Sequence, residues 1–389
     1  MNPGAIVDPA EVRRLVPQVI SVLVRRGADF ATAEDAVQEA LVKALDVWPR
    51  TPPSEPLGWL ITVSWRSFLD MARAATARRG REERVEAEPV GGPVDDRDES
   101  LWLYFLCAHP DLTPSSAVAL TLRAVGGLTT RQIAQAYLVP EATMAQRISR
   151  AKATVARSGL HGPGDPATVM RVLYLVFNEG HSGDVDLASE AIRMARELAA
   201  LSNDPESDGL LALMLLHHAR RSSRTRPDGG LVALADQDRG IWDTALIAEA
   251  IELLQRALAR DCLGEFQAQA AIAALHADAR SVEETDWVQI VEWYDELLLF
   301  SDTPIVRLNR AVAVGEADGA PAGLAALADV DEGVPRRDAV AAHLYERRGD
   351  LETAALLYAS AAHHAPSLAE RDHLMRQAAR LHHAQKPSG

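Results

Sequence analysis

Basic and amide side chains recur between residues 128 and 155 at spacings suited to reading DNA. Thr129 and Gln132 form a T-x-x-Q box, in which each side chain can accept a hydrogen bond from the other residue's backbone and so start a short helix. After a turn, a longer helix is expected from Glu141 to about Arg157. Two helices joined in this way form a helix-turn-helix, whose second helix fits the DNA major groove.

The second of these helices carries the candidate contacts to DNA. They share polar or cationic side chains and lie mostly on one face: Thr143, Gln146, Arg147, Ser149, Arg150 and Lys152. Arginine and glutamine can bind base edges through two hydrogen bonds, and lysine and arginine also hold phosphates. On these residues alone, an ordinary helical hairpin with a solvated basic face remains the alternative.

A second basic segment is expected to form a helix from Leu57 to about Arg79, after a Pro-rich loop at 49–58. Basic side chains interleaved with aromatic ones suit single-stranded or distorted DNA. A solvated run of charges is the commoner explanation of such a segment. The candidate residues here are Trp59, Arg66, Arg73, Arg78 and Arg79.

An acidic face precedes the Pro-rich loop. A helix is expected at 9–26, and another from Thr32, which can cap it. In the second helix Asp35 and Glu39 lie four residues apart and so point to one side, beside Gln38. Such a face suits a basic partner, although the solvated side of any surface helix would look the same.

The chain has 389 residues, enough for two or three domains, and its few aromatic residues, 5% of the total, favour helices over strands. We expect an all-α fold. The predicted parts are a first helical domain (1–84), a linker (85–99), a helix-turn-helix domain (100–160) and a helical C-terminal extension (165–389). The linker contains six acidic residues and no periodic apolar pattern.

The end of the chain has the pattern of a tetratricopeptide (TPR) repeat. Gly349 is followed by small residues where paired helices touch, by Tyr358 and by Pro366, and a similar segment ends at Pro304. We therefore predict a TPR-like stack of helices, with a generic helical domain as the alternative. Breaks between helices are expected near 180–186, 202–208, 225–230, 261–264, 301–304 and 315–321.

The acidity of the chain lies in its C-terminal part. The net charge is −15, but residues 1–160 contain 19 Lys and Arg and 19 Asp and Glu. Residues 1–160 therefore have no net negative charge, so a basic DNA-binding patch can exist on this part of the chain.

Several classes of site and location are not expected. Cys107 and Cys262 provide no disulfide framework. No metal or cofactor site is expected, because the histidine pairs are adjacent and diverge on a helix. The sequence lacks nucleotide-binding and hydrolase motifs, so we expect no enzyme and no catalytic residues. Without an apolar run of about 20 residues or a signal peptide, we expect no membrane association and a cytoplasmic location.

The order of these features resembles an extracytoplasmic-function (ECF) bacterial sigma factor. The resemblance rests on AEDAVQEALVKAL, GWLITVSWRSFLDMAR and LTTRQIAQAYLVPEATMAQRISRAK, and covers the σ2 and σ4 domains of that family. The later segments RVLYLVFNEGHSGD and DQDRGIWDTALIAEA look like the group with a long TPR-like extension. Arg66 departs from the family, which often has Asn there, and the neighbouring Trp65 is also unusual.

The resemblance implies a partner for each surface. Asp35, Gln38 and Glu39 would dock on the β′ clamp helices of core RNA polymerase. The β subunit of the polymerase would be a second contact. The loop 49–58 and the helix after it would meet the −10 promoter element, and the second helix of the helix-turn-helix the −35 element. The C-terminal extension would regulate activity and could receive a protein partner or a ligand. The alternatives are a helix-turn-helix regulator that does not dock on polymerase, and a TPR scaffold.

Overall fold

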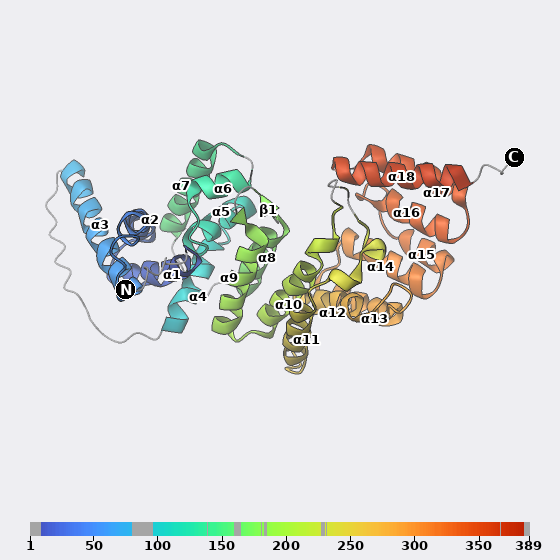
Figure 1. The fold of residues 1–389 in the computed structure, drawn as a ribbon, viewed down its shortest axis with the longest axis horizontal. Helices are drawn as coiled ribbons and strands as arrows, with labels where there is room; N and C mark the ends of the chain where they lie inside the picture. The colour runs from blue at the N-terminus through green and yellow to red at the C-terminus, as the bar shows by residue number, and fades with distance from the viewer. Residues whose placement is uncertain are drawn as a thin grey trace. The chain divides into compact units, whose positions relative to one another are not determined.

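The computed structural model describes residues 9–79, 96–137, 139–158, 165–179, 181–182, 185–226, 230, 232–365 and 367–384. The chain divides into two compact units, Met1–Asn203 (unit 1) and Asp204–Gly389 (unit 2). Figure 1 draws unit 1 in blue to green and unit 2 in green to red. Both are helical, as predicted, and the exception among the described residues is one short hairpin in unit 1.

The hairpin of unit 1 pairs His181–Ser182 with Val185–Asp186 in antiparallel register. The described elements of unit 1 are, in chain order, α1 (Pro9–Arg25), α2 (Phe30–Val47), α3 (Pro56–Arg79), α4 (Asp96–Cys107), α5 (Pro114–Ala124), α6 (Thr130–Ala136), α7 (Glu141–Ser158), α8 (Pro166–Glu179), β1 (His181–Ser182), β2 (Val185–Asp186) and α9 (Leu187–Ser202).

Two helix starts in unit 1 differ from the sequence-based expectation. Helix α2 begins at Phe30, because the Asp29 carboxylate accepts a hydrogen bond from the Thr32 N–H (3.0 Å) and is the cap. Thr32 therefore lies inside the helix. Helix α4 begins at Asp96, so 96–99 are helical rather than linker, and residues 80–95 of the proposed linker region lie outside the described residues.

The helix-turn-helix has the predicted local structure. The Thr129 N–H donates to Gln132 Oε1 (2.9 Å) and the Gln132 N–H donates to Thr129 Oγ1 (3.2 Å), which confirms the capping box. Gly127 precedes it with φ +66°, a conformation that favours glycine. The core between the two helices contains four buried side chains, Ile133, Ala134, Met144 and Ile148.

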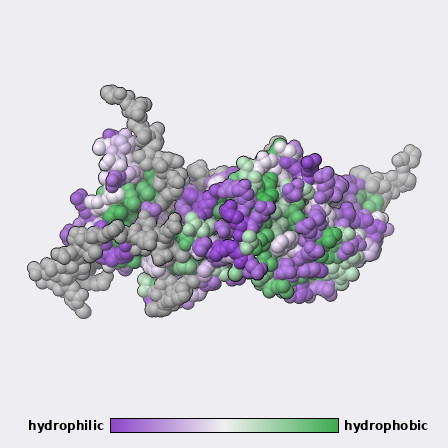
Figure 2. Space-filling view, turned by 90° about the horizontal axis from the view of Figure 1, so that it is seen from below, coloured by the Kyte–Doolittle hydropathy of each residue, from purple (hydrophilic) through white to green (hydrophobic). Residues whose placement is uncertain are grey.

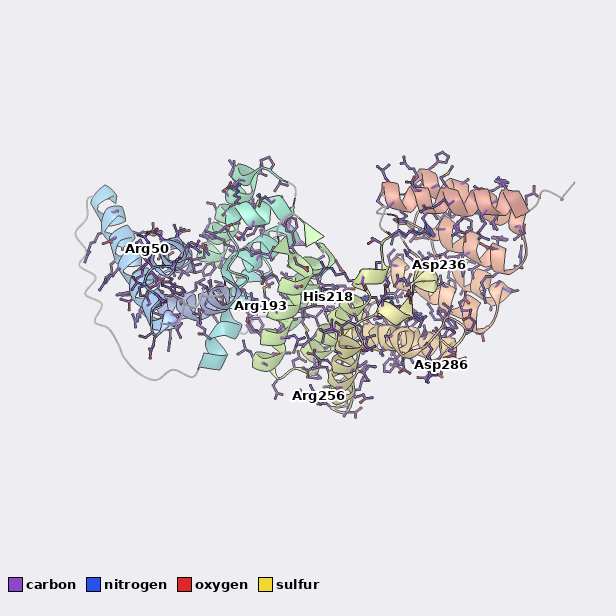
Figure 3. The ribbon with its side chains drawn as sticks, in the orientation of Figure 1. Arg50, Arg193, His218, Asp236, Arg256 and Asp286 are labelled. Atoms are coloured by element: carbon purple, nitrogen blue, oxygen red, sulfur yellow. The ribbon has the colours of Figure 1, made fainter. Side chains whose placement is uncertain are left out.

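Helices α8 and α9 belong to unit 1, although the sequence assigned them to the C-terminal extension. The buried Tyr104 hydroxyl on α4 donates to the Met194 carbonyl on α9 (3.1 Å), and Arg193 Nη2 donates to the Val125 carbonyl after α5 (3.5 Å). Burial raises the pKa of Tyr104 well above its ordinary value, so this hydroxyl stays a donor. Figure 3 shows Arg193 on α9. Helix α9 therefore completes the fold around α4 and α5.

Unit 2 consists of helices joined mostly by short connections. Its described elements are α10 (Pro205–Ala219), three 3₁₀ turns (Arg221–Ser223, Leu234–Asp236 and Arg239–Ile241), α11 (Thr244–Leu258), α12 (Glu265–Asp278), α13 (Trp287–Phe300), α14 (Pro304–Ala317), α15 (Ala320–Leu327), α16 (Arg337–Arg347), α17 (Leu351–His363) and α18 (Leu368–Ala384). Consecutive helices pack in pairs, as the predicted TPR-like stack requires.

The residues that suggested a TPR repeat occupy the expected places. Ala354, Tyr358 and Ala361 of α17 are buried in one cluster with Leu374 and other residues of α18. Pro366 lies outside the described residues. The sequence thus correctly predicted that Tyr358 and the small residues lie where the paired helices touch.

The connection between α10 and α11 is much longer than the break predicted at 225–230, because it runs from 220 to 243. A buried hydrogen bond joins its two ends, and a second bond fixes the serine that accepts it. Trp242 Nε1 donates to Ser223 Oγ (2.8 Å), and Ser223 Oγ donates to the Arg220 carbonyl (2.8 Å). Long connections of this kind are usually functional.

Hydrophilic side chains cover most of the described surface in Figure 2, with hydrophobic atoms in separate patches among them. Both cysteines are free thiols, Cys107 buried and Cys262 exposed. Among the described helices none is both long and apolar enough to cross a bilayer.

Candidate nucleic-acid interface

Helix α7 has one buried and one exposed face. Its buried face is made by Met144, Ile148, Ala151 and Val155, which fixes the rotation of the helix against α5 and α6. The predicted −35 contacts that are exposed share the opposite face: Thr143, Gln146, Ser149 and Arg150. Arg147 is half-buried. None of the arginines on α7 is fully buried, so their guanidinium groups can donate hydrogen bonds to a DNA duplex.

Lys152 does not lie on this exposed face. It is 8% exposed, and its Nζ forms ion pairs with Glu34 and with Asp35 Oδ1 (2.6 Å), both on α2. Its assignment to the −35 surface is therefore wrong for this arrangement, because the ammonium group is covered by α2. The sequence contained the signal, since Lys152 follows the buried Ile148 by four residues and precedes the buried Val155 by three.

Helix α3 presents only part of the predicted −10 set. Arg66 is exposed, and Arg73 is exposed and paired with Asp70 (3.2 Å). Trp59 is half-buried and packs edge-on against Trp48, with 5.4 Å between ring centroids. The side chains of Arg78 and Arg79, at the end of the helix, lie outside the described residues.

The unusual Trp65 has a structural contact. The guanidinium carbon of Arg26 lies 5.5 Å from the centroid of its ring, a cation–π distance, and Phe68 packs on the same ring. Trp65 therefore helps to join α1 to α3. Lys43 Nζ donates to Ser67 Oγ (3.1 Å) and joins α2 to α3.

The three predicted polymerase-binding residues on α2 have different surroundings. Glu39 is exposed. The Asp35 side chain is 56% exposed and pairs with Lys152. Gln38 is half-buried, and its Nε2 is a buried donor without a hydrogen-bond partner in the structure.

Helix α2 also exposes apolar side chains. Val42 and Leu45 are 66% and 73% exposed. Asp35, Glu39, Val42 and Asp46 follow one another at spacings of four, three and four, so they form one stripe along the helix. Mixed acidic and apolar exposure on one face is typical of a protein-binding surface.

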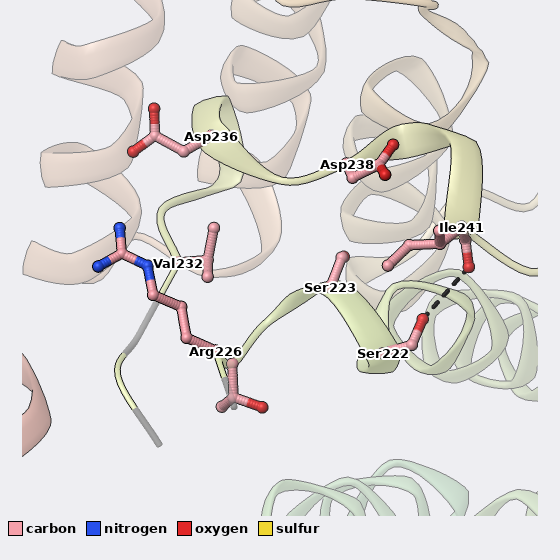
Figure 4. Close-up of a pocket in the computed structure, with 8 residues that line it drawn as sticks. Ser222, Ser223, Arg226, Val232, Asp236, Asp238 and Ile241 are labelled. Atoms are coloured by element: carbon pink, nitrogen blue, oxygen red, sulfur yellow. Dashed lines mark hydrogen bonds between the residues drawn. The ribbon is translucent and has the colours of Figure 1, made fainter. Parts of the chain in front are cut away.

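The long connection in unit 2 surrounds a hollow of about 620 Å³ (Figure 4). Most of the residues that line it are of polar type: Ser222, Ser223, Thr225, Arg226, Val232, Asp236, Asp238 and Ile241. His217 lies on α10, just before this connection. Its burial, and then the positive charges of Arg220 and Arg224, lower the pKa of its imidazole to about 3, so the ring is neutral and its Nδ1 accepts a hydrogen bond from Arg220. Among the described residues no group of three His, Cys, Asp or Glu is placed to hold a metal ion.

Three family models match this chain. Sigma-70 region 2 matches residues 12–78, which contain α1 to α3, and sigma-70 region 4 matches residues 102–155, which contain the helix-turn-helix. A family of unknown function, DUF6596, matches residues 166–258, including α8, α9 and the long connection.

Curated relatives agree with these models. An uncharacterized protein of Rhizobium meliloti is 41% identical over 347 residues, covering 81% of each chain. The probable ECF RNA polymerase sigma factor SigI of two Mycobacterium tuberculosis strains is 31% identical over 184 residues, covering 45% of this chain and 63% of the relative. No solved structure matches the chain.

The region 2 match contains α2 and α3, which carry the proposed polymerase and −10 residues. The region 4 match contains most of α7, which carries the proposed −35 residues. Sigma factors are not enzymes; they bind core RNA polymerase and promoter DNA. The chain belongs to the ECF family of RNA polymerase sigma factors, which direct the initiation of transcription, and it carries a helical C-terminal extension.

Proposed function

We propose that α2 docks on the β′ clamp helices of core RNA polymerase. The observation that supports this most is the exposed stripe Asp35, Glu39, Val42 and Asp46, because a basic helical partner would gain both ion pairs and apolar burial on it. Contact with the β subunit is a further part of this proposal. The partner implies that the protein acts in the cytoplasm.

The Pro-rich loop and α3 are proposed to meet the melted −10 element. Exposed Arg66 supplies positive charge on α3, and Arg73, further along the helix, is exposed and paired with Asp70. A loop stiffened by prolines suits a preformed pocket for an unstacked base. We assign Arg66 to a phosphate rather than to a base. A phosphate contact does not require the fixed geometry that reading a base edge requires, and the Arg66 guanidinium is exposed.

Run-off transcription with core polymerase tests the whole assignment. Adding the chain should produce transcripts that start at defined sites on genomic templates, and core polymerase alone should not. Random initiation in the presence of the chain would contradict promoter selection by these surfaces.

Arg150→Ala should relax selectivity at the −35 element. Arg150 is exposed on α7 and can hold a base edge through two hydrogen bonds, whose loss is worth about 1–3 kcal/mol of discrimination. The measurement is the ranking of promoters with single base changes at −35. An unchanged ranking would remove Arg150 from the reading set.

Unit 2 is proposed to regulate the sigma domains by receiving a ligand or a protein partner. The hollow of about 620 Å³ and the length of the connection around it support this. A truncation that tests it should end after Asn203 rather than near 165, because α9 packs on α4 and α5. Transcription by residues 1–203 is expected to differ from that of the full chain. Equal activity and equal promoter ranking would contradict a regulatory role.

A further inference from the structure

A basic stretch stands out in unit 2, where the long connection begins. Unit 2 is acidic as a whole, with 18 Lys and Arg against 30 Asp and Glu in residues 204–389. Residues 217–227 depart from this balance, because they contain four arginines and no acid. Charges that are taken out of water need an opposite charge or other polar partners, so the surroundings of these arginines decide what the stretch can bind.

Two of these arginines converge on one atom. Arg220 Nη2 lies 2.8 Å from His217 Nδ1, and Arg224 Nη2 lies 3.3 Å from the same nitrogen. A neutral imidazole has one ring nitrogen that accepts hydrogen bonds, whereas each guanidinium has five N–H donors. His217 therefore cannot satisfy both arginines, and two positive charges remain side by side.

Trp242 brings a third guanidinium close to the first. The guanidinium carbons of Arg220 and Arg239 lie 5.8 Å and 5.0 Å from the centroid of its ring, and both are cation–π distances. Arg239 Nη1 also donates to the carbonyls of His276 and Ala279 at the end of α12, at 2.6 Å each. Ring faces and backbone carbonyls hold these side chains in place but carry no full negative charge. Arg220, Arg224 and Arg239 thus form one arginine cluster.

The electrostatics of Arg220 differ from those of a paired arginine. Burial, and then the positive charges of Arg224 and Arg239, lower the pKa of Arg220 to about 10. Burial alone would also lower the pKa of Arg193 on α9, but that arginine pairs with two glutamates and its pKa is raised. In the part of the chain that the structure describes, no Asp or Glu forms an ion pair with Arg220. Arg220 therefore has the burial of a paired arginine without the acid.

Ser223 joins the arginine cluster to the hollow of about 620 Å³. Its Oγ accepts from Trp242 Nε1 and donates to the Arg220 carbonyl, and the same residue lines the hollow. Arg224 is exposed, so a solute can reach the cluster from water. Figure 4 shows Ser223 on one segment and the two aspartates of the lining on the segment across from it. A negative group is therefore favoured on the side of the arginines.

We propose that the arginine cluster binds the phosphate group of a small molecule, at Arg220 and Arg224. A phosphate monoester carries about −1.5 to −2 charges at neutral pH and several acceptor oxygens. It therefore supplies both the negative charge and the acceptors that the cluster lacks, and guanidinium groups match its geometry through paired hydrogen bonds. The proposal names the class of ligand for the regulatory role proposed for unit 2, and it rests on that role only for an effect on transcription.

Calorimetric titration of the full chain with inorganic phosphate tests the site. We expect saturable binding with a Kd below about 1 mM at a fixed ionic strength. Arg224→Gln should weaken this binding at least about tenfold, because a hydrogen bond between charged groups is lost. Arg224 is exposed, so R224Q should fold as the unaltered chain does. Absence of saturable binding, or an equal Kd for R224Q, would overturn the proposal.

The matched control is R307Q, which removes one positive charge from an exposed position of α14. Its Kd for phosphate should equal that of the unaltered chain. A loss as large as that of R224Q would mean that phosphate responds to the net charge of unit 2, and would overturn a defined site. R220Q should also bind at least about tenfold more weakly. Circular dichroism establishes that R220Q is folded, and if it is not, R224Q and R307Q decide.

Other anions test the class of ligand. Citrate offers carboxylates on a small molecule, and hexaglutamate offers them on a peptide. Both should bind more weakly than phosphate, because each carboxylate carries a single charge and the arginine cluster is compact. Tighter binding of citrate would assign the site to a carboxylic acid, and tighter binding of hexaglutamate would assign it to an acidic protein segment. Either result would overturn the phosphate assignment.

Run-off transcription separates the site from the regulatory role. Phosphate should change the yield with the unaltered chain more than the yield with R224Q, and this comparison removes any effect of phosphate on polymerase itself. Binding without such a difference would leave the site in place and contradict its regulatory role. If phosphate does not bind while residues 1–203 and the full chain still differ in transcription, the ligand class is wrong and regulation by unit 2 stands.

Discussion

Replacing Glu39 with arginine is expected to weaken binding of core polymerase at least about tenfold, or about 1.4 kcal/mol. Glu39 is exposed in the middle of the stripe on α2 and takes no part in the cluster around Lys152. The substitution changes attraction to repulsion at the centre of a surface that faces a basic partner. Because the residue is exposed, the stability of the chain should change little.

The control for this substitution is Glu252→Arg, which makes the same change of charge on an exposed position of α11 in unit 2. Binding is measured by fluorescence anisotropy with labelled chain at two salt concentrations. The loss caused by E39R should shrink as salt rises, because exposed charges are screened over about 10 Å at 0.1 M. Equal affinities of E39R and E252R would show that α2 does not dock through its acidic stripe.

Helix existence was predictable along most of the chain, because each helix contains its own signals. The capping box at Thr129 and the apolar spacing of α7 define the helix-turn-helix without reference to the remaining fold. The N-cap of α2 was missed by three residues, since Asp29 and Thr32 are both good caps and Asp29 makes the bond. Local physics decides such features, and small errors at boundaries follow from competing caps.

The contact between α2 and α7 was not predictable, because it joins residues more than 100 positions apart. The sequence does contain half of the signal: Glu34 and Lys152 each lie at a buried position of their helix, and a buried charge needs an opposite one. Pairing them requires knowing which helices meet. Leu45 is exposed for a related reason, since α2 packs through small residues such as Ala36 and Ala40 and leaves this leucine outside.

Glu34→Ala is expected to cause the largest loss of stability, about 3–5 kcal/mol, because it leaves Arg123 as a buried cation without its acid and Lys152 with the more exposed Asp35 alone. For a unit of this size each kcal/mol lowers Tm by roughly 2–4 °C, so the fall should be roughly 6–20 °C. The lower end applies if α2 and α7 separate and water reaches the cations. Scanning calorimetry measures the shift, and Asp46→Ala is the matched control.

Asp46 pairs with Arg50 (2.5 Å), but both side chains are more than 70% exposed, so D46A should cost less than about 1 kcal/mol. The double variant E34M/K152M separates burial of charge from loss of packing. Replacing a buried ion pair with apolar side chains of similar volume is often neutral, so the pair should recover much of the Tm that E34A loses, while Arg123 keeps its bond to the Leu128 carbonyl. A fall in Tm for E34A no larger than for D46A would mean that Glu34 is hydrated, and that α2 and α7 are not held together by it.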